Sequence, residues 1–283
     1  MNKKLLAGIG LSGVLMLGSV YSISANTSGY DLYKTALKNT HSVDSAALDI
    51  SLNLTDNDQV IFTAESSVKT DDKHQLKSVS ASLANETETS QMNLYQQDGS
   101  WFVTKQGMEQ VYQMELSSPH HQQASELQDD LENLIDVMTK NLQQQITVTE
   151  QKNGSQSIEL DLTGKEIPLA ANAFSTLMIK HAIMIQDNAE PTSSNFHIQP
   201  SFPELDHDIT VKQMKLTANV NQENYIEKQT VKAVVSGKDE QGKTHELVLE
   251  VELNAAAYNQ TSLTPIEIPA ENVEKFDHGH FAN

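Results

Sequence analysis

Alternation of apolar and polar residues with a period of two over residues 46–68 constrains the fold of this chain more than any other feature. Polar positions such as Asp49, Ser51 and Asn53 separate the apolar ones, and the turn-forming triplet Asp56-Asn57-Asp58 divides the stretch in two. The apolar members are Leu48, Ile50, Leu52, Leu54, Val60, Phe62, Ala64 and Val68. Because successive side chains of a strand point to opposite faces, this pattern predicts an antiparallel hairpin with one apolar and one wet face.

The same period predicts further strands along most of the chain. Turn-forming pairs at Asp98-Gly99 and Gln106-Gly107 bound a strand that carries Trp101 and Val103 on one face. A small hairpin is expected over 146–162, and three long strands over 214–253 include Met214 and Leu216 on an apolar face. Prolines flank residues 265–269, which predicts a last edge segment there because proline cannot donate to a sheet.

Three segments have the 3.6-residue period of helices instead. Ser28 can cap a short helix with Tyr30, Tyr33 and Leu37 about one turn apart. The clearest helical pattern covers 127–142, and a more apolar one runs from Pro168 to Ile185 and contains Phe174 and Leu177. Helices segregated among many amphipathic strands predict an α+β fold: a curved, half-wrapped antiparallel sheet, an unclosed barrel, with a few helices packed on its concave face.

The N-terminus predicts export. Residues 1–25 contain Lys3 and Lys4, an uncharged apolar run and small residues before Ala25, as in a secretory signal peptide cleaved after Ala25 or Ser24. The alternative is an uncleaved anchor, although the apolar run is short for a span. No later stretch is apolar enough for a second span, so we expect a secreted or cell-envelope protein without an integral membrane span after cleavage.

The rest of the chain is expected to form one domain, residues 26–270. Within it, residues 186–208 contain three prolines and little periodicity, which indicates either a functional flap or a linker. Residues 271–283 are expected to be a loose tail.

Composition excludes several classes of function. The net charge is −19 and every one of the 19 basic residues is a lysine, so the surface repels phosphate backbones and lacks the guanidinium that binds them best. We therefore expect no nucleic-acid partner. The chain has no cysteine, which excludes disulfides, thiol catalysis, cysteine-ligated metals and lipidation after the signal.

Catalytic and metal-binding motifs are also missing from the sequence. It contains no G-x-S-x-G elbow and no glycine-rich phosphate loop, so we predict a protein that is not an enzyme and has no cofactor. Three clusters have metal-ligating residue types without a ligand-like spacing, and we interpret them as exposed loops or tail and predict no metal site. They are His120-His121, Asp206-His207-Asp208 and Asp277-His278-Gly279-His280.

The order of elements resembles the lipoprotein-carrier superfamily, the LolA and LppX-like group, and especially uncharacterised exported members from Gram-positive bacteria. The resemblance rests on SGYDLYKTALKNTHSVDSAALDISLNL, LYQQDGSWFV, the late long strands and LTPIEIPAENVEKF. It implies an unclosed, curved sheet around helices, with an acyl chain or other apolar ligand held between them. This chain departs from many relatives in having no lipidated cysteine and in the length of its 186–208 segment.

Two functional hypotheses follow. In the first, an extracytoplasmic protein holds an apolar or lipid-like ligand between sheet and helices. In the second, a cell-envelope module contacts a protein partner through a sheet edge, the acidic surface or residues 186–208, without a small ligand. The first predicts ligand contacts at Leu48, Ile50, Phe62, Trp101, Val103, Phe174, Leu177, Met214 and Leu216. The competing interpretation of these residues is plain core, because the fold itself needs such side chains buried.

Overall fold

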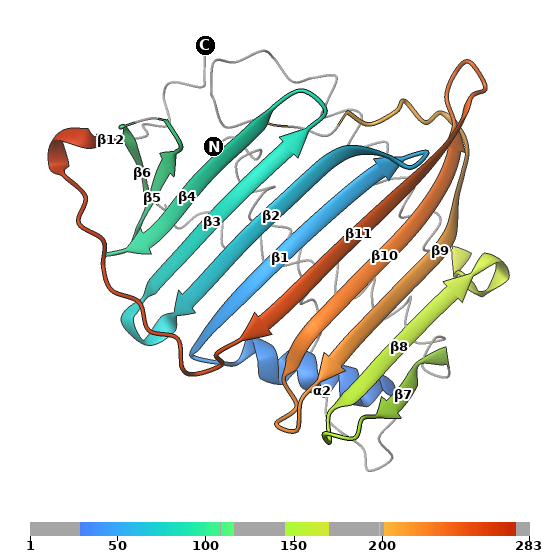
Figure 1. Cartoon of the computed structure of the whole chain (residues 1–283), viewed down its shortest axis with the longest axis horizontal. Coiled ribbons are helices and arrows are strands. Elements are labelled where there is room, and N and C mark those ends of the chain that lie inside the picture. Colours follow the sequence, from blue (N-terminus) through green and yellow to red (C-terminus); the bar gives the residue numbers. More distant parts are fainter. Residues whose placement is uncertain (1–28, 108, 116–144, 170–197, 199–200, 276–283) are drawn as a thin grey trace.

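A wide, curved β-sheet organises the chain in the computed structural model, which describes residues 29–107, 109–115, 145–169, 198 and 201–275 (Figure 1). Within these residues the sheet has 12 strands, and neighbours are antiparallel except for β12 and β6. From one edge to the other the strands are β12 (Val273–Lys275), β6 (Val111–Glu115), β5 (Ser100–Lys105), β4 (Thr89–Gln97), β3 (Leu76–Asn85), β2 (Gln59–Asp71), β1 (Ser45–Asp56), β11 (Thr244–Ala256), β10 (Ile226–Lys238), β9 (His207–Val220), β8 (Gln156–Thr163) and β7 (Thr147–Glu150). The prediction of an unclosed antiparallel sheet with few helices is confirmed.

Two tight turns set the register of the first half. Asp56 pairs with Gln59, which leaves only Asn57 and Asp58 in the β1–β2 turn, and both have positive φ, 48° and 66°. Gln97 pairs with Ser100 in the same way across Asp98-Gly99. Two positive φ angles define the turn type whose twist matches that of the flanking strands. These local residue choices fix the register beside each turn, but a bulge at Ile61 shifts it within β2, so Val60 lies opposite Thr55 and is 52% exposed instead of sharing the face of Phe62.

The centre of the sheet joins strands that are far apart in the sequence. β1 lies between β2 and β11, and its pairing with β11 runs from Ala47 opposite Ala256 to Asp56 opposite Leu247. One meander, β1 to β6, and a second, β7 to β11, thereby become a single sheet.

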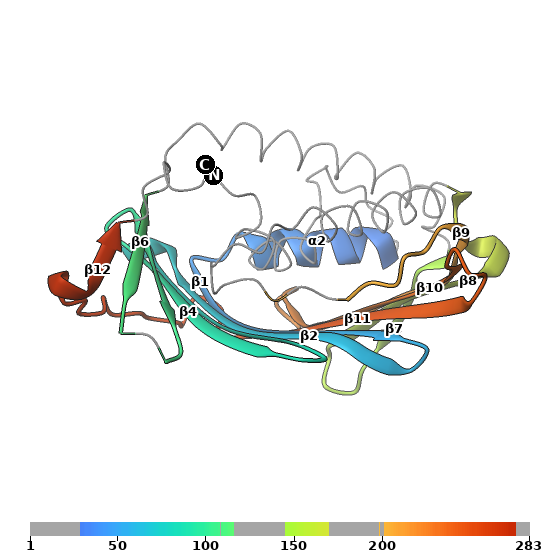
Figure 2. The ribbon, with the colours of Figure 1, turned by 90° about the horizontal axis from the view of Figure 1, so that it is seen from above.

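Helix α2 (Gly29–His41) lies against one face of this sheet, and Figure 2 shows the sheet curving toward that side. We call this the inner face and the opposite side the outer face. The position of α2 agrees with the helix expected after Ser28. Within the described residues, the short 3₁₀ helices η1 (Asp72–His74), η4 (Gly164–Glu166) and η5 (Ala270–Asn272) lie between strands. The helices expected over 127–142 and over most of 168–185 lie outside the described residues, as does the expected signal peptide.

The C-terminal segment differs from expectation in two places. The edge strand expected over 265–269 is wrong, because these residues form no strand. Ile266 instead pairs with a side chain: its N–H donates to Gln97 Oε1 at 2.9 Å and its carbonyl accepts from Gln97 Nε2 at 3.1 Å. The sheet edge is formed by β12, inside the segment expected to be loose, where Val273 pairs with Val111.

The described end of the 186–208 segment packs onto the sheet. Leu205 is 3% exposed and belongs to the largest apolar cluster, together with the buried Ile198 and the half-buried Phe202. Asp206 N–H also donates to the Lys238 carbonyl at 2.9 Å. Residues 198–206, where described, are therefore part of the core packing that precedes β9.

Candidate ligand-binding face

The cross-strand register places all seven described candidate residues on the inner face. Leu48 and Ile50 alternate with the exposed Asp49 and share their face with Phe62, which pairs with Leu54. The remaining four are Trp101, Val103, Met214 and Leu216, and each is linked to this face by continuous opposite pairs. The expectation of one common apolar face is met. Phe174 and Leu177 lie outside the described residues.

These seven residues do not form one compact site. They are divided among four apolar clusters: Ile50 and Phe62 lie in one, Val103 in another, and Leu216 and Met214 pack against two more. From β5 to β9 there are seven inter-strand steps, which span about 34 Å at a spacing of about 4.8 Å. Any ligand that contacts both ends would have to be long.

Burial divides the candidates further. Ile50, Phe62 and Val103 are buried, so they belong to the core. Leu48, Trp101, Met214 and Leu216 are half-buried and keep accessible apolar surface. Trp101 therefore packs against the cluster that contains the buried Val103 but is itself only half-buried.

One row of apolar side chains, the apolar strip, crosses the inner face from β1 to β6. Each member lies directly opposite the next: Leu48, Val68, Val79, Leu94, Val103 and Tyr112. Five inter-strand steps make it about 24 Å long. Leu94 is 1% exposed at its middle, whereas Leu48 and Tyr112 at its ends are half-buried. The neighbouring row contains small residues, including Ser66 opposite Ala81.

Helix α2 covers a different part of the inner face, over β8 to β10. Its side chains Leu32, Ala36 and Leu37 are 9%, 0% and 3% exposed and cluster with strand residues. These strand residues are Ile158, Ala218, Val220 and Ile226. Tyr33 Oη donates to Gln229 Oε1 at 2.9 Å, and burial raises the pKa of the Tyr33 phenol above its usual range. The helix is thus anchored by packing and by side-chain hydrogen bonds, which include the buried one from Ile226 N–H to Thr40 Oγ1 at 2.9 Å.

The structure also contains a polar cluster that sequence reasoning missed. His245 is 5% exposed, with Nδ1 2.7 Å from Asp56 Oδ2 and Nε2 3.3 Å from Asp239 Oδ2. Desolvation opposes ionisation of Asp239, but hydrogen bonds from Lys243 N–H and His245 outweigh it and lower the pKa of that carboxyl. The cluster links the β1–β2 turn to the β10–β11 turn. Asp239 is 6 residues from His245 in the sequence, but Asp56 is 189 residues away. No local motif could therefore have revealed the whole cluster.

The histidine clusters noted in the sequence gain no metal-like geometry where the structure describes them. His207 Nε2 lies 3.0 Å from Asp206 Oδ2, while Asp208 accepts from Lys238 Nζ at 2.7 Å. Across the described ranges, no group of three or more His, Asp or Glu residues could hold a metal ion. The other two clusters, at 120–121 and 277–280, lie outside these ranges.

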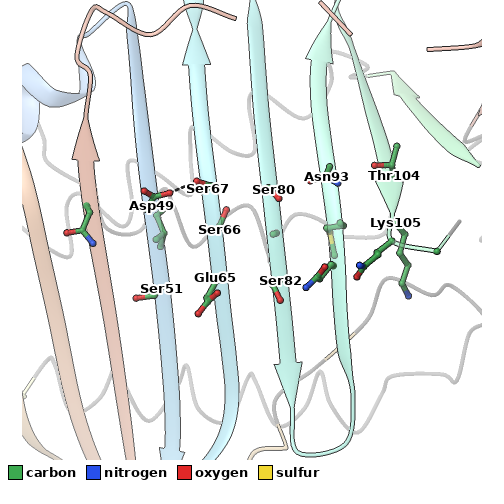
Figure 3. A pocket seen from close by; sticks show the side chains of 17 residues that line it. Asp49, Ser51, Glu65, Ser66, Ser67, Ser80, Ser82, Asn93, Thr104 and Lys105 are labelled. Carbon is green, nitrogen blue, oxygen red and sulfur yellow. Dashed lines mark hydrogen bonds between the residues drawn. The ribbon is translucent and has the colours of Figure 1, made fainter. Parts of the chain in front are cut away.

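The outer face of β1 to β5 has a groove of about 810 Å³ (Figure 3). Polar side chains surround it, and Figure 3 shows them rising from neighbouring strands. The labelled ones include Asp49, Ser67, Ser80, Asn93 and Thr104. The groove and the apolar strip lie on opposite faces of the sheet and are therefore separate. The polar side chains of the groove do not suit an apolar ligand.

Comparisons with known proteins identify no family. No family model matches the chain, and no curated protein matches it. One similar solved structure is a conserved protein of unknown function with a hot dog fold from Alicyclobacillus acidocaldarius, at 13% identity over 86% of this chain and 89% of that one. The TM-score is 0.12, so this likeness carries no argument about fold or function. Among the helices of the described residues, none is long and apolar enough to cross a membrane.

Proposed function

We propose that this chain is a non-enzymatic, extracytoplasmic binding protein that holds an apolar or lipid-like ligand against the inner face of its sheet. One observation carries the proposal: half-buried apolar side chains gather on the inner face of β1 to β6, both within the apolar strip and beside it. They are Leu48, Val68, Leu83, Met92, Trp101 and Tyr112. Placing a ligand over them would remove more apolar surface from water, worth about 25 cal/mol per Å².

The shape of the face supports an elongated ligand. The apolar strip is continuous and about 24 Å long across the strands, because its members lie opposite one another on successive strands. In the neighbouring row, the side chains of Ser66 and Ala81 are small, so the inner face is lower there than at the larger side chains on either side. We call this part of the face the low row. A flexible hydrocarbon chain fits a long, low surface better than a compact ring system does. The predicted signal peptide supports the extracytoplasmic location, and the resemblance to lipoprotein carriers supports an apolar class of ligand.

A fluorescence experiment tests this proposal, because Trp101 is the only tryptophan in the chain. The neutral apolar dye N-phenyl-1-naphthylamine, bound to the inner face, would accept excitation energy from Trp101. Ala81→Phe fills the low row and is expected to weaken dye binding about tenfold, equal to about 1.4 kcal/mol. Ser80→Phe adds the same side chain to the outer face of the same strand and is the matched control. Val68→Thr, which keeps the side-chain shape, should weaken binding in the same direction.

Native mass spectrometry supplies an independent readout. The protein is purified without detergent from cells that export it, and the intact mass is read beside the mass after organic extraction. An adduct of lipid size that extraction removes supports the proposal. A bare chain together with dye binding that Ala81→Phe and Val68→Thr leave unchanged overturns it, and favours a module that contacts a protein partner.

A further inference from the structure

The outer groove is built from two parallel rows of polar side chains that cross the strands. One row consists of Asp49, Ser67, Ser80, Asn93 and Thr104, each directly opposite the next. The other consists of Ser51, Glu65, Ser82 and Gln91. Between the rows lies the backbone of Ile50, Ser66, Ala81 and Met92, which also lines the groove. The groove therefore has a flat backbone floor and two polar walls.

The β5–β6 turn forms one end of the groove. Gln106 and Gly107 line it, and Gln106 N–H donates to the Gln91 carbonyl at 3.1 Å, which holds the turn against β4. At the other end Asn254 of β11 lies opposite Asp49. The groove thus extends across the strands from β11 to β5, about 24 Å for five inter-strand steps.

The side chains of both rows select a ligand by hydrogen bonding. Hydroxyl and amide groups can each donate and accept, and they repeat at the strand spacing of about 4.8 Å. The rows contain no apolar side chain, and their two carboxylates, Asp49 and Glu65, only accept when ionised. Asp49 Oδ1 already accepts from Ser67 Oγ. With a chain charge of −19, a polyanion is disfavoured, so the suitable ligand is neutral, extended and rich in hydroxyl groups.

An aromatic pair lies beside the polar rows on the same face. Tyr95 and Phe102 are directly opposite each other, and they lie two residues from Asn93 and Thr104 on their respective strands. Both are half-buried, so part of each ring is accessible. Aromatic rings combine a large apolar face with, in tyrosine, a polar tip. Such a pair can stack on the apolar C–H face of a sugar ring whose hydroxyls reach the adjacent row.

We infer that the outer groove binds a neutral glycan chain, which runs across β1 to β5 with its hydroxyls on the two polar rows. The groove volume of about 810 Å³ is large enough for a short oligosaccharide rather than a single small molecule. This site is independent of the apolar ligand proposed for the inner face. A protein with both sites would connect a lipid-like ligand on one side of its sheet to a polysaccharide on the other.

Isothermal titration calorimetry with cellopentaose and with chitopentaose tests the inference. The first probe offers hydroxyls alone, and the second adds acetamido groups that Gln91 and Asn93 can recognise. We expect at least one probe to bind, and Ser80→Phe, which blocks the groove from an exposed position, to weaken that binding about tenfold or more. Asn93→Ala removes one amide without adding bulk and should weaken it severalfold.

The inner-face variant Val68→Thr is the control, because Val68 lies on the opposite face of β2 from its neighbour Ser67 and does not line the groove. Glycan binding that Val68→Thr leaves unchanged and Ser80→Phe abolishes supports the outer groove, whatever the outcome of the dye experiment. Failure of both oligosaccharides to bind at millimolar concentration would overturn the inference. Binding that neither Ser80→Phe nor Asn93→Ala affects would also overturn it, since the glycan would then lie elsewhere.

Discussion

Leu37 provides the sharpest test of how α2 is attached to the sheet. Its side chain is 3% exposed and belongs to the cluster that includes Ile158, Val220 and Ile226. Leu37→Ala removes buried methyl groups and leaves a cavity beside strands whose backbones are fixed by pairing on both sides. Such changes cost about 2.7 to 5 kcal/mol in a well-studied series, and limited collapse here places the expected loss of unfolding free energy near 3 kcal/mol. For a domain of this size, the melting temperature should fall by about 6 to 12 °C.

Two probes of urea unfolding turn this variant into a test of domain organisation. Circular dichroism reports on the whole sheet, whereas Trp101 fluorescence reports on β5, six strands away from β10. Because β1 and β11 join the two meanders, we expect both transitions to shift together when Leu37 is truncated. Lys38→Ala, at the exposed neighbouring position, is the control and should cost less than about 1 kcal/mol.

Two results would contradict this reasoning. A loss below about 1 kcal/mol for Leu37→Ala would mean that α2 contributes little packing energy. A shift of the circular dichroism transition without a shift of the Trp101 transition would mean that the two meanders unfold separately, against the single domain expected for residues 26–270.

Three further predictions concern individual contacts. Tyr33→Phe removes the hydroxyl that donates to Gln229 and should lower the unfolding free energy by about 1 kcal/mol, measured by urea denaturation; an unchanged midpoint would contradict a role for this bond. Hydrogen bonds from His74 and from Leu263 N–H lower the pKa of Asp71, so its stabilising effect should be complete above about pH 4 and be lost as the pH falls through the lower folded-state pKa. Asp71→Asn should therefore unfold more easily than the native chain at pH 7, and this difference should shrink toward pH 2; a constant difference in melting temperature would refute the assignment. Gly99 has φ +73° and no atom within 4 Å of an added Cβ, so Gly99→Ala should cost about 1 kcal/mol from backbone strain alone, whereas Ser100→Ala should cost less.

Apart from Val60, which the β2 bulge turns away from the apolar face, the residue pattern alone was sufficient to predict the two faces of the sheet. Leu48 and Ile50 alternate with Asp49 and Ser51, and the period of two determines their sides whichever strands become neighbours. Turn residues such as Asp98-Gly99 were equally readable, because positive φ is a local property. The α+β class, the helix that became α2 and most strands followed from the same local patterns.

Local patterns were misleading where the partner was distant. Residues 265–269 look like an edge strand, yet the prolines leave few donors and the Gln97 side chain pairs with Ile266 instead. Val273 to Lys275 have no strong pattern, and their parallel pairing with β6 depends on where the preceding chain places them. The contact of Gln97 with Ile266 and the pairing of β12 with β6 both depend on long-range geometry. The local period of apolar residues does not determine either of them.

What the sequence determined by itself was therefore which side chains share a face, because alternation and turn conformation depend only on neighbouring residues. Only the tertiary structure decided which strands lie side by side, since any two amphipathic strands could pair. The β1–β11 junction divides the candidate residues among four clusters, and the meander aligns Ser67, Ser80 and Asn93 into one row of the outer groove. The same long-range pairing brings Asp56 to His245. Both candidate sites depend on that order of strands.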